Sequence, residues 1–371
     1  MRLYQLEKQL HIPMIGVADL APLDQLKALV QDRQAKENLS GFEPDLSQAL
    51  EPHKAFPGGR TVFAIAIPYE MTNVHPALSP DHYGVISNMA WAYDYHQVVH
   101  RHLDDLEAWI EGKVPGAACI KHVDTGPLLD RSLAEMTGLG AYGRNQFLLT
   151  EDWGTATYLG YLITTASLKD LDLDPQAESK GHLAAICRDC NRCQVACPTG
   201  ALHGERAFDG QKCLSTLTQT KRPLTYAERE TIGLRLYGCD LCQQSCPAND
   251  KTLAVPDVYQ RETSNRLDPF DLLGLSNKGF KKAYGDMGFA WRGASVLKRN
   301  ALIAIGNRRQ AEDIPRLLPY LDHGSPLVRE YAAWAVMRID PVQGHRVLAQ
   351  RDDKAEWHWE DLVAYYLNKR E

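Results

Sequence analysis

A dense run of cysteines is the feature that most restricts what this chain can fold into. The stretch CRDCNRCQVACP, from Cys187 to Pro198, has the spacing C-x2-C-x2-C-x3-C, with a proline directly after the last cysteine. This is the spacing of bacterial ferredoxins, in which three cysteines hold one 4Fe-4S cluster and the fourth reaches a second cluster. The run therefore predicts a segment whose fold is organised by bound metal.

A second group of cysteines follows, with Cys213 upstream of the stretch CDLCQQSCP, which begins at Cys239. Cys213 can replace the missing leading cysteine of this group, so that eight thiolates complete two clusters. The alternative is a pair of zinc sites, although zinc sites usually pair C-x2-C with a distant C-x2-C. The first expected ligand set is Cys187, Cys190, Cys193 and Cys246, and the second is Cys197, Cys213, Cys239 and Cys242.

The remaining cysteine, Cys119, stands alone in an apolar stretch and is expected in a core. No apolar run approaches the ~18 residues of a membrane span. The first residues lack the basic start and the unbroken apolar stretch of a secretory signal. We therefore expect a cytoplasmic protein, whose cysteines stay reduced and do not form a disulfide framework.

The 371 residues exceed one ordinary core, and three regions differ in pattern. Short apolar runs at 61–69, 117–123 and 155–165 predict buried strands, while 92–111 has apolar residues at helical spacing. This alternation indicates an α/β domain, and the polar stretch 168–182 is expected to be a linker or surface loop. The predicted domains are 1–167 (α/β), 168–261 (a ferredoxin-like module with two clusters) and 262–371 (helical).

The last region repeats itself and is basic. The stretches 297–307 and 328–338 match at an offset of 31 residues, which suggests stacked HEAT-like helix pairs, with an ordinary helical bundle as the alternative. Residues 278–346 carry twelve Lys and Arg against six Asp and Glu, in a chain of net charge −6. Such a module is typical of a protein that binds a polyanion. The candidate phosphate contacts are Lys298, Arg299, Arg308, Arg309, Arg329 and Arg338.

Two tryptophans of this region, Trp291 and Trp334, stand among small and apolar residues and are expected in the core, although either could stack on a base. The electrons also need an acceptor. The chain has neither G-x-G-x-x-G after a strand nor G-x4-G-K-S/T, so nicotinamide and P-loop chemistry are disfavoured. Flavin or a corrinoid remain.

Several motifs together resemble the epoxyqueuosine reductase family. They are VDTGPLLDR and AEMTGLGAYGRN between 123 and 145, GFEPD near 41, YDYH at 93–96, CLSTLTQ from Cys213 and YGCDLCQQSCP at the second cysteine group. The resemblance covers nearly the whole chain, and the helical tail after the cysteines is part of it. It fits a cytoplasmic branch, because no twin-arginine signal is present.

The resemblance implies that residues 1–167 bind cobalamin, with cob(II)alamin as the resting state, in a core shared with reductive dehalogenases. Two 4Fe-4S clusters feed electrons to the cobalt. The substrate is epoxyqueuosine at the wobble position of a tRNA with a G-U-N anticodon, and the epoxide oxygen is lost as water in the last step of queuosine synthesis. The resemblance further implies a reduced flavodoxin or ferredoxin as electron donor. We also expect no membrane partner and a monomer.

Opening an epoxide leaves an alkoxide, which a carboxylic acid with a raised pKa can protonate. By the family match Asp130 is the expected proton donor, and Asp124 is the second candidate. The alternative for Asp124 is a turn-stabilising residue ahead of TGP. For Asp130 it is a structural ion pair with Arg131 or Arg144.

Further cofactor contacts are expected around the motif YDYH and in the glycine-rich turn. His96 is assigned a hydrogen-bonding role rather than a cobalt bond, with an ordinary core or surface histidine as the alternative. Gly140 and Gly143 would permit close backbone approach to a ligand, with an ordinary turn as the alternative. The expected cofactor contacts are Asp94, Tyr95, His96, Asp130, Gly140, Gly143 and Ser215, and Gln219 is the expected RNA contact beside the cysteines.

Two rival functions share parts of this pattern. A corrinoid- or flavin-dependent reductase of a small molecule, similar to a dehalogenase, would use the clusters and the α/β domain but not the basic tail. A non-enzymatic RNA-binding iron–sulfur sensor would use the clusters and the tail, and it would bind no cobalamin. Truncation after about residue 265 and the cobalamin content distinguish these functions.

Overall fold

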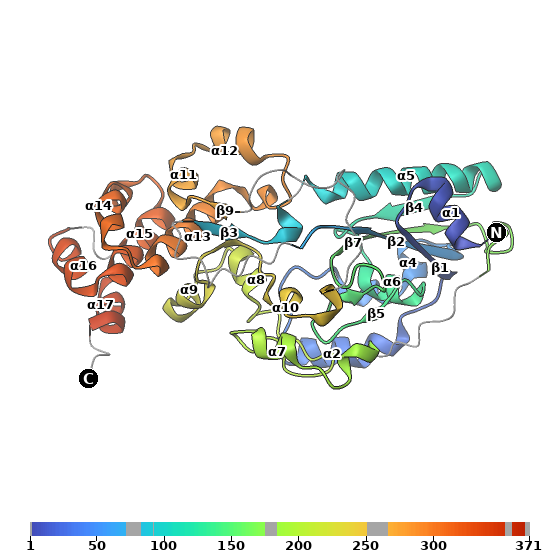
Figure 1. Cartoon of the computed structure of the whole chain (residues 1–371), viewed down its shortest axis with the longest axis horizontal. Coiled ribbons are helices and arrows are strands. Elements are labelled where there is room, and N and C mark those ends of the chain that lie inside the picture. Colours follow the sequence, from blue (N-terminus) through green and yellow to red (C-terminus); the bar gives the residue numbers. More distant parts are fainter. Residues whose placement is uncertain are drawn as a thin grey trace. The chain divides into compact units, whose positions relative to one another are not determined.

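The structure, a computed structural model, describes residues 2–71, 83–91, 93–174, 184–250, 266–352 and 358–367 (Figure 1). The chain forms two compact units. The first unit comprises 1–72, 92–213 and 240–260, and the second comprises 73–91, 214–239 and 261–371. The division into three domains that the sequence suggested, each with its own function, stays a prediction. None of the helices in the described ranges is both long and apolar enough to cross a bilayer.

A four-stranded sheet is the centre of the first unit. Its order is β1 (Met14–Asp19), β2 (Thr61–Pro68), β7 (Thr157–Thr164) and β4 (Cys119–His122). The three strands expected from apolar runs are therefore confirmed. Alternating helices and strands are typical of parallel sheets, but every neighbouring pair here is antiparallel.

Helices cover both faces of this sheet (Figure 1). The long helix α5 (Tyr95–Lys113) confirms the helix expected from 92–111, and it packs closely at Gly160, whose added Cβ would lie 2.5 Å from Val99. The opposite face packs against α6 (Asp130–Met136) through Tyr161 and its alternate neighbours on β7. The other helices of this part are α1 (Leu3–Leu10), η1 (Asp24–Leu26), α2 (Lys27–Ala35), α3 (Leu46–Ala49) and α4 (Pro52–Ala55).

The cysteine segment of the first unit has little regular structure. The hairpin of β5 (Ala141–Tyr142) and β6 (Leu148–Leu149) precedes it. The stretch expected as a linker is a loop in its described part, 168–174, but Leu168, Leu171 and Leu173 are buried, and 175–182 lie outside the described residues. The short helices of the cysteine segment are η4 (Ala185–Cys187), α7 (Arg192–Ala196), α10 (Leu241–Gln244) and η5 (Pro247–Asn249).

The second unit is mainly helical. Its two longest helices, α13 (Gly293–Arg308) and α15 (Pro326–Ile339), contain the two matching stretches at equivalent places and share one apolar core. A small sheet, in the order β8 (Arg235–Tyr237), β3 (Gly84–Ile86) and β9 (Arg266–Leu267), joins this core. The remaining helices are α8 (Leu214–Gln219), α9 (Tyr226–Ile232), α11 (Pro269–Gly274), α12 (Asn277–Tyr284), η7 (Ala290–Arg292), η8 (Ala311–Asp313), α14 (Ile314–Leu317), η9 (Leu318–Asp322), α16 (Pro341–Leu348) and α17 (Trp359–Leu367).

Two of the expected phosphate contacts are instead structural. Arg299 is only 2% exposed, and its guanidinium donates to the backbone carbonyls of Leu217, Thr218 and Thr220 at the end of α8. Burial lowers the Arg299 pKa to about 10. The side chain of Arg308 is equally buried, 3.1 Å from the carboxylate of Asp313. Both predictions are wrong, because these guanidinium groups face the interior, where arginine is tolerated only when it is paired.

We expect Arg299→Met to lower the free energy of unfolding by about 3 kcal/mol, because three buried carbonyl groups lose a charged donor. Urea-induced unfolding of the purified variant measures this change. Arg309→Met, which alters an exposed arginine at the end of the same helix, is the matched control. Equal stability of the two variants would contradict the structural role of Arg299.

Candidate functional site

Two carboxylates expected to act in catalysis meet in one turn after β4. The backbone N–H of Asp124 donates to Oδ2 of Asp130 at 2.8 Å. Asp124 has a left-handed backbone (φ 57°) and an exposed side chain, whose Oδ2 accepts from Tyr95 Oη at 2.8 Å. The Asp124 backbone thus shapes the turn, while its side chain contacts the YDYH motif rather than the backbone of TGP.

The carboxyl group of Asp130 keeps its proton to an unusually high pH. Its Oδ1 is buried and has no hydrogen-bond partner among the residues that the structure describes. Burial, and secondly the charge of Asp124, raise the Asp130 pKa to about 7. The alternative of a structural ion pair is not observed within the described ranges, because Arg131 lies over the Phe147 ring and Arg144 donates to backbone carbonyls. Asp130 therefore has the properties of a general acid at neutral pH.

The YDYH motif forms the start of α5 beside this pair. Asp94 caps the helix by accepting from the His96 backbone N–H, and its Oδ1 also lies 2.6 Å from His96 Nδ1. This hydrogen bond raises the His96 pKa. The other ring nitrogen, Nε2, is 4.0 Å from Asp124 Oδ2 and forms no hydrogen bond with any described residue. Asp94, Tyr95 and His96 are thus brought together with both acids.

Sequence reasoning missed Tyr161, which faces the same turn from β7. Its hydroxyl is buried, lacks a hydrogen-bond partner within the described part of the chain, and lies so near the turn that a Cβ added to Gly126 would be 2.4 Å away. Burial, and secondly the Asp130 charge, raise its pKa. The only sequence signal for Tyr161 was its alternate position on a predicted strand, which does not distinguish a site residue from the core.

Stacked aromatic rings lead from this site to the second cysteine group within the first unit. The ring of Tyr95 stacks on His96 at 4.3 Å and on Tyr158 at 4.7 Å. Tyr158 contacts Tyr69 at 4.8 Å, and the Tyr69 hydroxyl donates to Gln243 at 3.0 Å, between Cys242 and Cys246 in the chain. The stack fixes the start of α5 against the cysteine loop.

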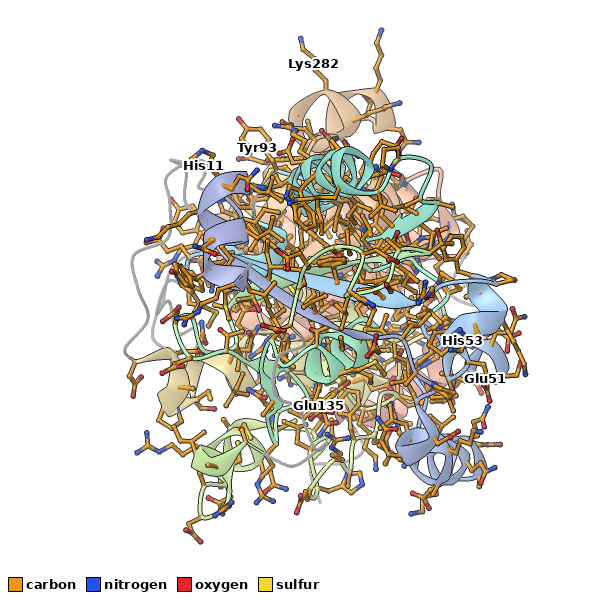
Figure 2. All side chains as sticks on the ribbon, turned by 90° about the vertical axis from the view of Figure 1, so that its right-hand side faces the viewer. His11, Glu51, His53, Tyr93, Glu135 and Lys282 are labelled. Atoms are coloured by element: carbon orange, nitrogen blue, oxygen red, sulfur yellow. The ribbon has the colours of Figure 1, made fainter. Side chains whose placement is uncertain are left out.

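A buried ion pair connects α6 to the segment between the cysteines. Glu135, which is labelled in Figure 2, is only 3% exposed. Arg206 donates to both carboxylate oxygens of Glu135, at 2.8 and 2.9 Å, and stacks over the Tyr142 ring. The helix that begins with Asp130 is thereby held to the cysteine segment.

The hairpin itself explains both glycines that were expected to approach a ligand. A Cβ on Gly140 would lie 2.4 Å from the Leu149 carbonyl oxygen, and one on Gly143 would lie 2.2 Å from the Leu149 side chain. The ordinary-turn alternative therefore accounts for Gly140 and Gly143 without a ligand.

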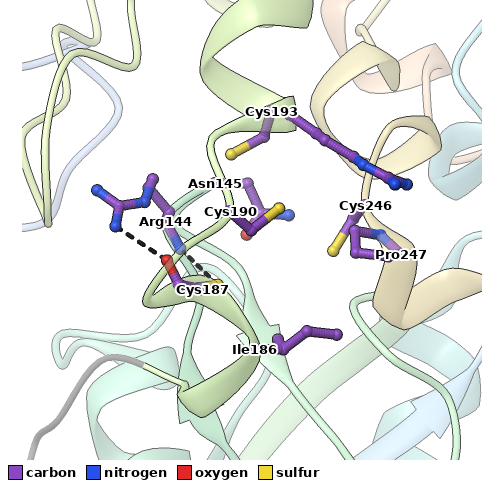
Figure 3. A pocket seen from close by; sticks show the side chains of 9 residues that line it. Arg144, Asn145, Ile186, Cys187, Cys190, Cys193, Cys246 and Pro247 are labelled. Carbon is purple, nitrogen blue, oxygen red and sulfur yellow. Dashed lines mark hydrogen bonds between the residues drawn. The ribbon is translucent and has the colours of Figure 1, made fainter.

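The first expected set of four cysteines lines one pocket of the first unit (Figure 3). Burial, with smaller effects of the other three thiols, raises the Cys246 pKa to about 11. The four cysteines line a pocket but do not converge on a single-ion site. Within the described ranges, no three His, Cys, Asp or Glu side chains lie close enough together to hold one metal ion. The pocket is lined by Cys187, Cys190, Cys193, Cys246, Arg144, Asn145, Ile186, Arg192 and Pro247.

Of the second expected set, Cys197, Cys213 and Cys242 are half-buried in the first unit, while Cys239 belongs to the second unit. Burial alone would raise the Cys197 pKa, but the Thr199 hydroxyl and nearby backbone N–H groups lower it below its usual range. A thiol that ionises readily is suited to bind metal. The lone Cys119 is half-buried on β4 rather than in a core.

The remaining expected RNA contacts, all in the second unit, differ in exposure and in hydrogen-bond partners. Gln219 donates to the carbonyl and hydroxyl oxygens of Ser215 and accepts from Tyr237. Arg309 is exposed and Lys298 is half-buried. Arg329 donates to the His323 carbonyl at 2.8 Å, and Arg338 pairs with Glu230 at 3.0 Å.

The two tryptophans of this unit also differ in exposure. Trp334 is fully buried, as expected. Trp291 is 61% exposed, so its expected place in the core is wrong. Its indole N–H donates to Tyr237 Oη at 2.6 Å, and the Arg292 guanidinium lies 4.5 Å from its ring. This ring is therefore held in a fixed position at the surface.

Family models match two segments of the chain. Residues 186–249 match a 4Fe-4S double cluster binding domain, which supports iron–sulfur clusters rather than zinc sites. Residues 50–125 match the model described as epoxyqueuosine reductase QueG. The two segments contain the cysteines and the YDYH motif, respectively.

Known proteins match over nearly the whole length. The epoxyqueuosine reductase of Staphylococcus aureus is 38% identical over 339 residues, which are 88% of this chain and 85% of that protein. That of Bacillus subtilis, solved with its catalytic aspartate loop swung out of the active site, has a TM-score of 0.84 at 30% identity and covers 97% of this chain and 99% of its own. An epoxyqueuosine reductase solved with an epoxyqueuosine-modified tRNA-Tyr stem loop has a TM-score of 0.85 at 30% identity, covering 99% and 100%. The chain therefore belongs to the epoxyqueuosine reductase family.

Proposed function

We propose that this chain reduces epoxyqueuosine to queuosine in tRNA. The observation that carries the proposal is the carboxyl group of Asp130, whose pKa burial raises to about 7, beside Asp124, Tyr95 and His96 in a chain of this family. A relative solved with an epoxyqueuosine-modified stem loop, and another solved with an aspartate-containing catalytic loop swung out of the active site, support the same chemistry here.

The reaction balances with two electrons and two protons: both epoxide C–O bonds break, a C=C bond forms, and the oxygen leaves as water. Asp130 gives a proton to the oxygen released from the ring, since its carboxyl group keeps a proton near pH 7. The carboxylate then recovers a proton from solvent. Asp124 keeps Asp130 in place through the backbone N–H bond to Oδ2.

The electrons would enter through two 4Fe-4S clusters, held by the two cysteine sets expected from the spacing. Thiolates suit iron because they are soft ligands. The first set already surrounds one pocket, and the clusters would supply single electrons from a reduced flavodoxin or ferredoxin. The protein would work as a monomer in the cytoplasm, on tRNA with a G-U-N anticodon.

Cobalamin is the proposed acceptor of these electrons, and the residues present fit a bound polar group. Three buried polar atoms around the turn, Asp130 Oδ1, His96 Nε2 and Tyr161 Oη, have no hydrogen-bond partner among the described residues. Unpaired buried atoms cost free energy, so a cofactor or substrate that pairs with them stabilises the site. Cobalamin would supply low-potential electrons to the substrate carbon, while Asp94, Tyr95 and His96 would orient it.

The second unit would hold the tRNA through HEAT-like helix pairs. Its basic stretch is suited to phosphates, and of the six expected contacts Arg309 is the most exposed. Trp291 is the strongest candidate for stacking on an unpaired base of the anticodon loop, because its ring is exposed and fixed. Ser215 and Gln219 lie in the same hydrogen-bonded group, through Tyr237.

We expect Asp130→Asn to lower kcat for epoxyqueuosine-containing tRNA by about 10²–10⁴-fold, because Asn cannot donate the proton. The wild-type kcat should fall as the pH rises through about 7, where the acid ionises. Single-turnover assays over pH 5–9, on protein with unchanged iron and cobalamin content, measure both effects. Asp124→Asn is the matched control, and an equal or larger loss there would assign the proton to Asp124.

The raised pKa of Asp130 also predicts a pH-dependent stability. The folded carboxyl group, with a pKa of about 7, binds its proton more tightly than the unfolded one, whose pKa is about 3.9. Its stabilising contribution is therefore complete at low pH and disappears as the pH rises to about 7. From pH 5 to pH 8, Asp130→Asn should gain about 3 kcal/mol relative to wild type in urea unfolding. A constant difference would mean an ordinary carboxylate.

We expect Trp291→Ala to raise KM for tRNA about tenfold with kcat unchanged, because stacking on one base contributes about 1–3 kcal/mol. Steady-state kinetics on the modified stem loop measure both constants. Tyr4→Ala, which removes an exposed aromatic ring of α1 in the first unit, is the control. An unchanged KM in both variants would contradict the stacking role.

A further inference from the structure

The turn between β5 and β6 contains a buried amide that neither the spacing of the cysteines nor the acid site explains. Asn145 is 4% exposed. Its Oδ1 accepts from the Phe147 backbone N–H at 3.2 Å, while its Nδ2 is buried without a hydrogen-bond partner in the part of the chain that the structure describes. The turn therefore presents one buried, unused N–H donor group.

The hydrogen bond from the Phe147 N–H to Asn145 Oδ1 determines where the donor Nδ2 lies. The oxygen and nitrogen of an amide side chain are assigned from their partners, and here the Phe147 N–H needs the oxygen. The nitrogen must then face the other way. Asn145 lines the cysteine pocket, and Figure 3 shows it between Cys187, Cys190, Cys193 and Cys246.

The other groups that line the pocket offer few alternatives to sulfur as acceptor. Besides the four cysteines they are two arginines, which only donate, and the apolar side chains of Ile186 and Pro247. An unpaired buried N–H group is unfavourable. A sulfur atom of the cluster that the four thiols hold is therefore the acceptor that the pocket offers to Asn145 Nδ2.

Two further features of the turn direct donors to the same place. The backbone N–H of Arg144 donates to Cys187 Sγ at 3.5 Å, so the turn already has one N–H···S contact. Gly143 leaves room for the amide, because a Cβ there would lie 2.6 Å from Asn145 Oδ1. The glycine that was expected near a ligand thus permits the conformation that places Asn145.

We propose that Asn145 Nδ2 donates a hydrogen bond to a sulfur of the 4Fe-4S cluster held by Cys187, Cys190, Cys193 and Cys246, and raises the reduction potential of that cluster. One-electron reduction adds one negative charge to the cluster and transfers no proton. N–H donors to sulfur stabilise that charge. The inference rests on the cluster assignment in the proposed function. The bond makes the first cluster easier to reduce than it would be without this donor.

Asn145→Asp keeps the oxygen that accepts from Phe147 but adds a negative charge, which lowers the potential by itself, so the uncharged Asn145→Leu is the main test. Asn145→Leu removes both groups. The control is Gln146→Met, in the same turn, since the Gln146 amide donates to the Arg144 carbonyl at 3.3 Å and does not line the pocket. EPR-monitored redox titration of the purified protein gives both cluster potentials.

In Asn145→Asp and Asn145→Leu, one of the two clusters should become at least tenfold harder to reduce, a fall of about 59 mV for one electron. The other cluster, and both clusters of Gln146→Met, should be unchanged. Potentials that stay constant in all variants, or that move equally in the control, would overturn the inference.

Iron analysis separates this inference from the function on which it rests. Wild-type protein without about eight irons would overturn the cluster assignment itself. Eight irons with unchanged potentials would overturn only the role of Asn145. If both substitutions lose iron, the reduced wild-type protein decides: a nitrogen hyperfine coupling at one cluster, altered by ¹⁵N labelling of asparagine side chains, supports the bond, and the lack of any such change refutes it.

Discussion

The pairing of β2 with β7 is the constraint on which the rest of the first unit depends. All eight residues of β2 are buried, and the strand pairs with β7 along its whole length. This register fixes which residues of β7 face α6, including Tyr161, and which face α5, including Tyr158. β4 pairs with β7 next, so that His122 lies opposite Tyr161 and the turn with Asp124 follows directly. The acid site is thus a consequence of strand register.

The site combines features that oppose stability. One carboxyl oxygen, one imidazole nitrogen and one phenol hydroxyl lie together without a hydrogen-bond partner among the described residues, and Asp124 holds a left-handed backbone. Such arrangements persist when the surroundings over-determine them. Here the surroundings are the buried sheet, the aromatic stack from His96 to Tyr69, and the pair of Arg206 with Glu135. The scaffold thus stabilises a site that keeps unpaired buried polar atoms within the described part of the chain.

The sequence predicted what depends on local pattern. Apolar runs located β2, β4 and β7, and cysteine spacing grouped the four thiols of the pocket. Charge alone misassigned Arg299 and Arg308, because a sequence does not show whether a guanidinium meets carbonyl groups or solvent. The apolar neighbours of Trp291 wrongly predicted a buried ring: Phe289 and Ala294 are buried, but Trp291 is 61% exposed. Tyr161 and Asn145 depend on contacts between distant segments, which no local pattern contains.

The fourth thiol of the first pocket comes late in the chain. Cys187, Cys190 and Cys193 are close together, but Cys246 follows about fifty residues later. At a synthesis rate of roughly 5–20 residues per second, three thiols wait about 3–10 s for the fourth. During that interval an incomplete thiolate triad is open to oxygen, which converts thiolates to sulfenic acid and beyond. A cell that makes this protein must therefore deliver iron and sulfide after translation has passed residue 246, or shield the nascent cysteines until then.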